Sequence, residues 1–366
     1  MARKLKSDRI LFLATILLVG LSIVMVYSAS AMLAQERYQQ PYLFLTKQLM
    51  WAVLGLALVG IVMRVDYRHY REPVLIWSCL GLAVLGLVGV LFCPPVNNAR
   101  RWVSFGGLGI QPSELAKLSL IFFIAALLER RVHRINELGF SLLPIAIVVC
   151  GLVGLILLEP DFGTSMTLAL IGAAMVFAAG LSYAHIGGAA LALLPLVTLV
   201  AIAAPYRRAR LLAFLNPWDD PLNTDFQIIQ SLLAVGTGGI SGRGLMNGVQ
   251  KLFYLPEPHT DFIYAVISEE LGLVGATLVL LCFCLITWRG LRIALRAPDC
   301  FGALLAFGLT MMVGVQAFVN ISVVLGLLPT KGLPLPFVSA GGSSLLINLL
   351  GMGVLLNVSQ HASSEV

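Results

Sequence analysis

Residues 251–275, KLFYLPEPHTDFIYAVISEELGLVG, lead from a polar loop into a long apolar stretch. Titratable side chains stand at the mouth of this stretch and continue inside it. A carboxylate at the centre of a bilayer costs about 2.5 to 3.5 kcal/mol, so several in one span indicate a cavity or a partner that they face. The segment therefore predicts a membrane helix that carries a functional site. Its titratable residues are Glu257, His259, Asp261, Glu269 and Glu270.

The rest of the chain is equally apolar. Hydrophobic residues make up 59% of the 366 residues and charged residues only 11%, whereas a soluble domain carries about 25% charge. A hydrocarbon core about 30 Å thick is crossed by about 20 apolar residues in a helix. We therefore predict an all-α polytopic membrane protein with about ten transmembrane helices. They are expected at residues 10–31, 43–63, 73–93, 112–128, 139–158, 163–180, 184–204, 261–287, 300–327 and 336–358.

The charges of the short loops predict the orientation. Basic residues near 3–9, 64–71, 130–134 and 289–296 all fall on one side of the membrane, and such a bias marks the cytoplasmic side. The first apolar run is long and has no small-residue cleavage site after a short h-region, so it is interpreted as the first helix and not as a signal peptide. Both termini are then predicted to be cytoplasmic.

A second group of cations remains on the predicted outer side. Long outer loops are exempt from the charge rule, which is one explanation for them. The other is an outward-facing anion site, because Arg and Lys bind phosphate or pyrophosphate. The residues concerned are Arg100, Arg101, Arg207, Arg208, Arg210, Arg243, Lys251 and Lys331.

The chain is predicted to be a single membrane domain over residues 1–366, with a large extracytoplasmic loop, 205–260, between helices 7 and 8. A loop of this length is usually functional. Apolar residues at helical spacing predict a short amphipathic helix near 224–236, lying on the outer leaflet. The glycines of 236–244 lack the GK[ST] ending of a nucleotide loop and are interpreted as a flexible turn.

Charged residues also occur within the expected spans. Glu114 and Lys117 are three residues apart, so they share one helix face and can pair. This pair either neutralises two costly charges or lines a substrate cavity. Glu159 and Asp161 stand in an outward turn, EPDFGTS, which is either a tight hairpin or part of a site.

Two classes of ligand are not indicated. The six cysteines and five histidines show no metal-type spacing, so no metal site is predicted. The pI near 9.1 does not indicate nucleic acid, because cytoplasmic loop charge and the outer anion site account for the basic balance.

Five motifs together carry a family resemblance, and they occur in order over almost the whole chain. They resemble the SEDS family of shape, elongation, division and sporulation proteins. Lys331 and the residues after it make the chain more similar to the cell-division members than to the elongation members. The motifs are NNARRW (97–102), IQPSELAK (110–117), EPDFGTS (159–165), LPEPHTDFIYAVISEELGLVG (255–275) and LPTKGLPLPFVSAGGSS (328–344).

The resemblance implies a peptidoglycan glycosyltransferase that polymerises lipid II on the outer face of the bacterial cytoplasmic (inner) membrane during septal wall synthesis. Asp261 matches the aspartate of the family's HTDF motif and is the candidate general base for an inverting reaction that forms a β-1,4 bond. The expected substrate-binding residues are Arg100, Arg101, Glu114, Lys117, Arg207, Arg210, Arg243, Glu257, His259, Lys331 and Ser343.

No built-in cofactor is expected, although Mg²⁺ or Mn²⁺ bridging Asp261 and pyrophosphate is compatible with this chemistry. The expected partners are a class B penicillin-binding protein and other division proteins. Three alternatives stay open: a lipid II flippase, a polymerase of the elongation type and a scaffold of the division complex. A flippase needs polar groups that are accessible from both leaflets, whereas the strongest motifs here gather at outer loops.

Overall fold

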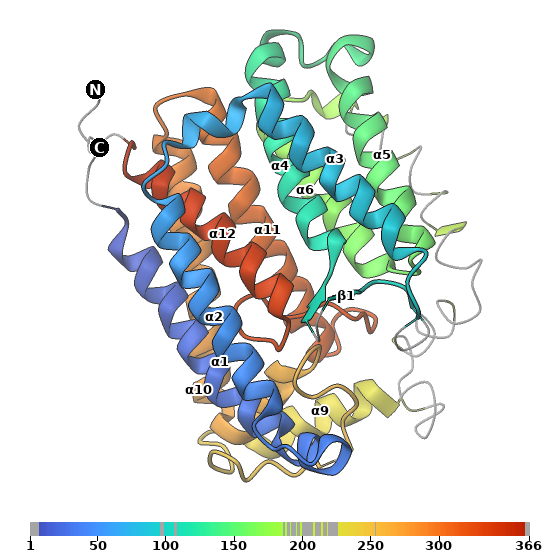
Figure 1. The fold of residues 1–366 in the computed structure, drawn as a ribbon, viewed down its shortest axis with the longest axis vertical. Helices are drawn as coiled ribbons and strands as arrows, with labels where there is room; N and C mark the ends of the chain where they lie inside the picture. The colour runs from blue at the N-terminus through green and yellow to red at the C-terminus, as the bar shows by residue number, and fades with distance from the viewer. Residues whose placement is uncertain are drawn as a thin grey trace.

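The computed structural model describes residues 7–95, 99–105, 108–185, 226–252 and 254–362, with isolated positions between 187 and 218. Long helices form one bundle (Figure 1). The helices are α1 (Arg9–Tyr38), α2 (Leu43–Val62), α3 (Pro73–Val90), α4 (Pro112–Arg131), α5 (Leu143–Leu158), α6 (Phe162–Ala178), α9 (Phe226–Gly238), α10 (Ile263–Arg296), α11 (Cys300–Val324) and α12 (Gly342–Ser359). The short elements are η1 (Tyr67–Arg71), η2 (Val132–Arg134), η3 (Leu138–Leu142) and an antiparallel hairpin of β1 (Val103–Phe105) and β2 (Leu108–Ile110).

The predicted all-α membrane fold is confirmed. Within the described residues, seven helical segments are long and apolar enough to cross a membrane, judged by length and composition alone. α4 carries more charged residues than such a span, and α6 is slightly short, with 17 residues. Both nevertheless pack inside the bundle. The span expected at 184–204 falls mainly outside the described residues.

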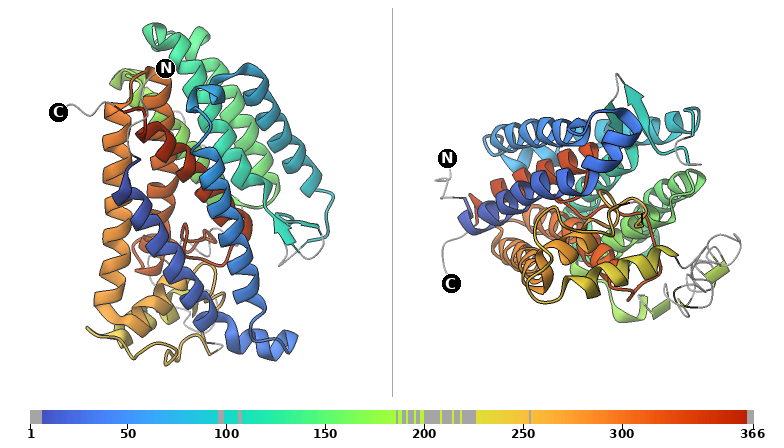
Figure 2. Two further views of the ribbon diagram at one scale, coloured as in Figure 1. Left: turned by 60° about the vertical axis from the view of Figure 1, so that its left-hand side comes forward. Right: turned by 90° about the horizontal axis from the view of Figure 1, so that it is seen from below.

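The central helices are α4, α11 and α12 (Figure 2). In the most apolar stretch of each helix, 78% of the residues are buried in α12 and 67% in α11, against 28% in the peripheral α3. The central helices also carry buried polar side chains, such as Lys117, Gln316 and Asn348. Polar groups face the bundle interior because the surrounding lipid offers them no hydrogen bonds.

Both termini lie at one end of the bundle, together with η1, η2 and the turn between α10 and α11 (Figures 1 and 2). These segments contain the short-loop cations that predict the cytoplasmic side. The hairpin, α9 and the segment before α12 lie at the opposite end, which is called the outer end below. The grouping of segments agrees with the predicted orientation, while the side that faces the cytoplasm stays a prediction.

The last helix begins later than expected, at Gly342 instead of residue 336. Residues 336–341 form turns because side-chain and backbone bonds tie them to the loop before α10. Ser339 Oγ accepts from Leu335 N at 2.7 Å and donates to Thr260 O at 2.5 Å. Ala340 N donates to His259 O at 2.9 Å. The two motif segments are thus held side by side.

The expected helix near 224–236 is confirmed as α9, but it packs on α10 instead of resting only on the outer leaflet. A Cβ atom on Gly238 would lie 1.9 Å from Ser268 O, and one on Gly242 would lie 2.1 Å from Glu270 O. These contacts allow no side chain. The glycine-rich segment forms the predicted turn, and it is docked tightly on α10 at Gly238 and Gly242.

α10 is broken at Gly272, where φ is 66° and ψ is −164°. The docked segment supplies the hydrogen bonds that the break removes. Arg243 N donates to Glu269 O and Gly244 N to Glu270 O, both at 3.0 Å, while Leu273 N donates to Gly239 O at 2.9 Å. A buried helix break is stable when another part of the chain satisfies its backbone groups, as here.

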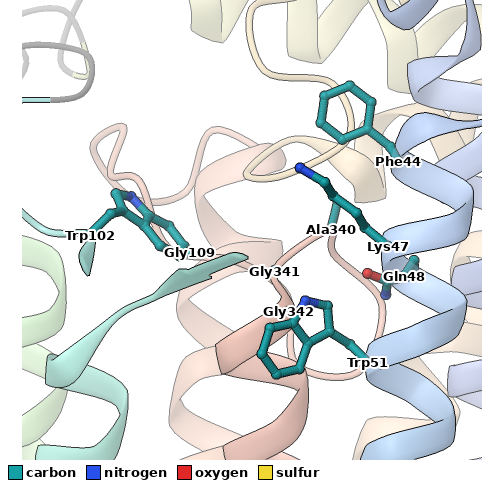
Figure 3. A pocket seen from close by; sticks show the side chains of 9 residues that line it. All are labelled: Phe44, Lys47, Gln48, Trp51, Trp102, Gly109, Ala340, Gly341 and Gly342. Atoms are coloured by element: carbon teal, nitrogen blue, oxygen red, sulfur yellow. The ribbon is translucent and has the colours of Figure 1, made fainter. Parts of the chain in front are cut away.

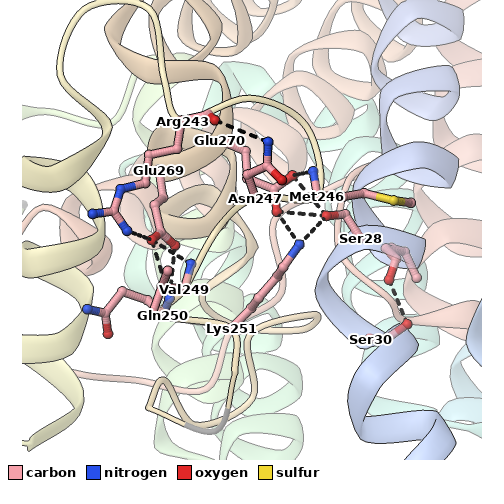
Figure 4. Close-up of polar contacts among 11 residues, drawn as sticks. Ser28, Ser30, Arg243, Met246, Asn247, Val249, Gln250, Lys251, Glu269 and Glu270 are labelled. Carbon is pink, nitrogen blue, oxygen red and sulfur yellow. Dashed lines mark hydrogen bonds and ion pairs between the residues drawn. The ribbon is translucent and has the colours of Figure 1, made fainter.

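The fully buried carboxylate of Glu270 binds three parts of the chain together (Figure 4). Ser28 Oγ of α1 donates to it at 2.7 Å, Lys251 Nζ at 2.6 Å and Met246 N at 3.0 Å. The ammonium of Lys251 balances the charge. These donors offset the cost of burying the carboxylate.

Glu269 holds the same loop from the other side (Figure 4). Its carboxylate accepts from Val249 N at 2.8 Å and from Gln250 N at 3.2 Å, and Arg243 Nη1 lies 3.5 Å away. The two neighbouring carboxylates therefore anchor residues 243–251 to α10. Their costly burial is explained by packing of the loop and requires no role in proton transfer.

Candidate functional site

Asp261 lies two residues before α10, at the outer mouth of the helix. Its backbone oxygen accepts from Asn320 Nδ2 at 2.8 Å, and the same amide donates to Leu333 O at 2.7 Å. Asn320 is a buried residue of α11. The side-chain amide of Asn320 therefore holds the residues just before α10 against the segment that contains Leu333.

Gly332 lies close to both Asp261 and Arg101. A Cβ atom built on Gly332 would lie 3.0 Å from Asp261 Oδ2 and 4.0 Å from Arg101 Nη1. The carboxylate and the guanidinium thus both lie close to the same small, exposed residue. A larger side chain at this position would contact the Asp261 carboxylate.

The turn of Glu159, Pro160 and Asp161 holds Arg101. Arg101 Nη2 donates to Pro160 O at 2.6 Å, and its Nε donates to Glu159 O at 3.4 Å. The Asp161 carboxylate lies 3.9 Å from Nε and also accepts from Thr164 N at the start of α6. These contacts engage Nε and Nη2 and direct the remaining Nη1 towards Gly332.

Lys331 adds a second cation at the same end of α6. Its Nζ lies 4.8 Å above the ring of Phe162 and 3.0 Å from Met166 Sδ. Burial lowers the pKa of Lys331 to about 8. The lysine is therefore mainly protonated at pH 7 and sits against apolar groups. A cation in such a place is available to an anionic ligand.

The Glu159 side chain is fully buried behind Arg101. Neither of its carboxyl oxygens has a hydrogen-bond partner among the described residues. Burial raises the pKa of Glu159 to about 8, the neighbouring Asp161 carboxylate adds to the rise, and Arg101 opposes it. The carboxyl is therefore mainly neutral at pH 7, which leaves the charge of Arg101 less compensated.

We expect replacement of Glu159 by Gln to flatten the pH dependence of stability. The unfolded carboxyl ionises near pH 4.5, whereas the folded one ionises near pH 8. Between these values the folded state binds the extra proton, so stability falls as pH rises, by up to about 1.4 kcal/mol per pH unit. Gln cannot titrate. The melting temperature in detergent should therefore fall less between pH 5 and 8 in Glu159→Gln than in the wild type.

Two comparisons isolate this effect. Glu257→Gln changes an exposed carboxyl in the same outer region and should keep the wild-type slope. Lys331 affects a different pH range. Because folding lowers its pKa from 10.5 to about 8, its contribution makes stability increase as the pH rises between those two values. Equal slopes for the wild type and Glu159→Gln between pH 5 and 8 would show that Glu159 is ionised in the folded protein.

A second polar cluster lies deeper, between α4 and α11. Lys117 Nζ donates to Glu114 Oε1 at 3.0 Å and to Gln316 Oε1 at 2.6 Å, and the lysine is fully buried. Gln316 Nε2 then donates to Pro334 O at 2.8 Å. Glu114 Oε2 has no partner among the described residues. The predicted ion pair is present and is connected through α11 to the segment beside Asp261.

Ser343 joins the cluster around Arg101 indirectly. Its hydroxyl accepts from Gln111 N at 3.2 Å, and Gln111 Nε2 donates to Asp161 Oδ2 at 3.4 Å. Ser343 lies in the first turn of α12 and is buried. The residue therefore supports the turn that holds Arg101.

His259 and Glu257 lie just before Asp261 but differ in their surroundings. The His259 ring is buried and packs against Phe44, with ring centroids 4.7 Å apart. Burial lowers the pKa of His259, so the ring is mainly neutral at pH 7. Glu257 is exposed, has a φ of 50° and accepts from Thr260 Oγ1 at 3.2 Å. Both shape the loop that presents Asp261.

Two of the predicted cations are described by the structure but are not brought to Asp261. Arg100 Nη1 donates to Leu91 O at 2.7 Å, at the end of α3. Arg243 faces Glu269, as described above. Arg207 and Arg210 lie outside the described residues. Among the described candidates, Arg101 and Lys331 are the cations that lie beside the segment of Asp261.

Sequence reasoning missed the two amides of α11. Gln316 and Asn320 bind the backbone of the segment next to Asp261. They are four residues apart in an otherwise apolar helix and so share one face. That spacing is the signal that could have found them.

Comparisons with known proteins cover nearly the whole chain. Residues 8–364 match the model of the cell cycle protein family of FtsW, RodA and SpoVE. A probable peptidoglycan glycosyltransferase FtsW of Geobacter metallireducens is 44% identical over 358 residues, which cover 97% of this chain and 95% of the relative. Stage V sporulation protein E of Bacillus subtilis is 42% identical over 364 residues, which cover 98% and 99%.

Solved structures have the same fold. A chain from a peptidoglycan synthase complex, described as coordinating polymerization and crosslinking, has a TM-score of 0.80 and 33% identity, with coverage of 98% of this chain and 99% of that chain. The rod shape determining protein RodA of Thermus thermophilus has a TM-score of 0.71 and 30% identity, with 98% of both chains covered.

Proposed function

The chain belongs to the cell cycle protein family of FtsW, RodA and SpoVE and is a membrane-embedded peptidoglycan glycosyltransferase, and on this premise we propose that it polymerises lipid II during septal wall synthesis. The proposal places the reaction on the outer face of the bacterial cytoplasmic membrane, with both termini in the cytoplasm. The observation that carries it is the approach of Asp261 and Arg101 to Gly332. A carboxylate and a fixed cation in one open place suit proton removal beside a departing pyrophosphate.

In the proposed reaction Asp261 is the general base. The 4-hydroxyl of the acceptor sugar gives its proton to the carboxylate as its oxygen attacks the anomeric carbon of the donor. The bond between that carbon and the pyrophosphate oxygen breaks, and the electron pair leaves with the lipid pyrophosphate. Attack from the face opposite the leaving group converts the α-linked donor into a β-1,4 product.

Positive charge at the leaving group is the second requirement. Arg101 Nη1 and the Lys331 ammonium are the proposed contacts of the pyrophosphate. The N-terminus of α6 lies at the same place, since Phe162 begins the helix and packs under Lys331. The Asp161 carboxylate already caps this N-terminus, so Arg101 and Lys331 supply the positive charge for the leaving group.

A divalent cation is compatible with this site as a companion of the substrate. No group of three candidate metal ligands occurs in the part of the chain that the structure describes. A single carboxylate together with phosphate oxygens is a common way to bind Mg²⁺. We therefore propose that a cation, where the reaction uses one, arrives with the pyrophosphate.

The proposed partners are a class B penicillin-binding protein, which would crosslink the new strands, and other division proteins. The similar chain in the peptidoglycan synthase complex supports this, because the description of that complex joins polymerization with crosslinking. The outer loop anchored by Glu269 and Glu270 offers such a partner a surface at the outer end of the bundle.

The proposal is tested with purified protein and its partner in detergent, using labelled lipid II. A detergent micelle does not have two separate leaflets, so movement of lipid II from one leaflet to the other cannot produce a signal in this assay. We expect a ladder of glycan strands. Absence of polymer, together with transfer of lipid II across the bilayer of proteoliposomes, would support the flippase instead. Activity only with an elongation-type partner would support the elongation role.

A further inference from the structure

A groove of about 140 Å³ opens at the outer end of the bundle, beside the loop of Asp261 (Figure 3). One wall is the first half of α2, another is the segment that leads into the β1–β2 hairpin, and the floor is formed by residues 340–342. Trp51 and Trp102 lie on opposite sides of it, one on each wall.

Two glycines let the indole rings lie against the backbone. A Cβ atom on Gly342 would lie 2.0 Å from Trp51 Nε1, and one on Gly109 would lie 3.0 Å from Trp102 Cε3. An added methyl group at Gly342 would displace the Trp51 ring. The close approach fixes the positions of both rings and so forms a rigid aromatic pocket.

The groove also contains polar atoms. Gln48 Nε2 donates to Ser22 Oγ at 3.0 Å and to Ser339 O at 3.3 Å. These bonds fix the amide and turn its oxygen to the groove (Figure 3). Trp51 is 9% exposed, and none of the described residues accepts a hydrogen bond from its Nε1. The groove thus offers one acceptor and one donor between two aromatic rings.

The floor of the groove is connected to the site around Asp261. Ala340 N donates to His259 O at 2.9 Å, and Ser339 Oγ donates to Thr260 O at 2.5 Å. Phe44, which lines the groove, packs on the His259 ring. A molecule in the groove therefore lies next to the chain segment that carries Asp261.

We propose that this groove is a subsite for one N-acetylhexosamine ring of the glycan chain, adjacent to the ring that reacts at Asp261. The inference rests on the proposed polymerase function. Pyranose rings present C–H groups with partial positive charge, which pack on aromatic faces, and their hydroxyl and amide groups match the indole N–H and the Gln48 oxygen. A lipid chain would leave both polar atoms without hydrogen-bond partners, which is unfavourable for buried polar groups.

The test uses a soluble β-1,4 tetramer of N-acetylglucosamine, which has no lipid, phosphate or peptide. Binding to the purified protein is measured by saturation-transfer NMR. Trp51→Leu and Trp102→Leu should each weaken binding about tenfold, the effect of losing about 1.4 kcal/mol. Trp77→Leu is the matched control, since Trp77 lies on the exterior of α3 and is 61% exposed. It should bind like the wild type.

Polymer length from lipid II gives a second readout, in which Trp51→Leu and Trp102→Leu should give shorter strands than Trp77→Leu. Trp102 lies outside the helices, so its variant decides the question where Trp51→Leu fails to fold. Equal binding by all variants, or none by the wild type, would overturn the subsite. Binding that is lost in the two groove variants, while the wild type makes no polymer, would support the subsite and reject the polymerase.

Discussion

Replacement of Asp261 by Asn is expected to abolish strand formation while the protein stays folded. Asn keeps the shape of the side chain, and the backbone oxygen that accepts from Asn320 is unchanged. It cannot accept the proton of the acceptor hydroxyl. Loss of a general base typically lowers the rate by about 10² to 10⁴. Polymer formation from labelled lipid II should therefore fall by at least about a hundredfold.

Binding and stability distinguish this result from misfolding. The melting temperature of Asp261→Asn should stay within a few degrees of the wild type, because a partly exposed substitution changes stability by about 0.5 kcal/mol. Lipid II should still protect the variant against unfolding. Glu137→Gln, which changes an exposed carboxylate at the opposite end of the bundle, should polymerise normally. Strands of normal length from Asp261→Asn would refute the assignment of the base.

Hydropathy and periodicity predicted most of the fold. The apolar stretches gave the positions of the spans, because a bilayer demands long apolar helices. The pattern near 224–236 gave α9, since three to four apolar residues per two turns define one face. Both signals are local in sequence. Element boundaries that depend on distant contacts were less accurate, as the late start of α12 shows.

The candidate site shows the limit of local signals. Arg100 and Arg101 are neighbours in the sequence, yet one donates to the end of α3 and the other to the turn before α6. Nothing in their spacing separates the two. The contact of Arg101 with Pro160 depends on how distant helices pack, which a single sequence does not record.

Buried charges illustrate the same point. A carboxylate in or beside an apolar stretch has the same hydropathy whichever residue carries it. Hydropathy alone therefore does not distinguish Glu269 and Glu270 from Asp261. In the structure each receives several donors from residues 243–251 or from α1. Their partners, rather than their depth, identify them as anchors of the outer loop.

Replacement of Lys117 by Met is expected to lower stability and to abolish polymerisation. The variant leaves the Glu114 carboxylate buried without its cation and removes the donor to Gln316. Breaking a buried pair in this way costs about 3 to 5 kcal/mol. Gln316 also holds Pro334 in the segment beside Asp261. Thermal unfolding in detergent and the lipid II assay measure the two effects.

The double variant Glu114→Gln/Lys117→Met separates structure from function. It contains no buried charge at this place, so most of the lost stability should return. If the pair lines the substrate cavity, polymerisation should stay absent in the double variant. Arg71→Met is the matched control. It removes a half-exposed cation paired with Glu129, which is worth about 1 kcal/mol or less.

The combination of the two readouts decides between the alternatives left open by the sequence. Lys117 is fully buried, and Oε2 of its partner Glu114, the oxygen that does not face the lysine, has no hydrogen bond among the described residues. A purely structural pair would be replaceable by a neutral pair of similar size, with both stability and strand formation restored. A pair that contacts substrate requires the charge itself. Recovery of stability without polymer in the double variant therefore assigns Lys117 to the substrate cavity, whereas recovery of both assigns it to packing.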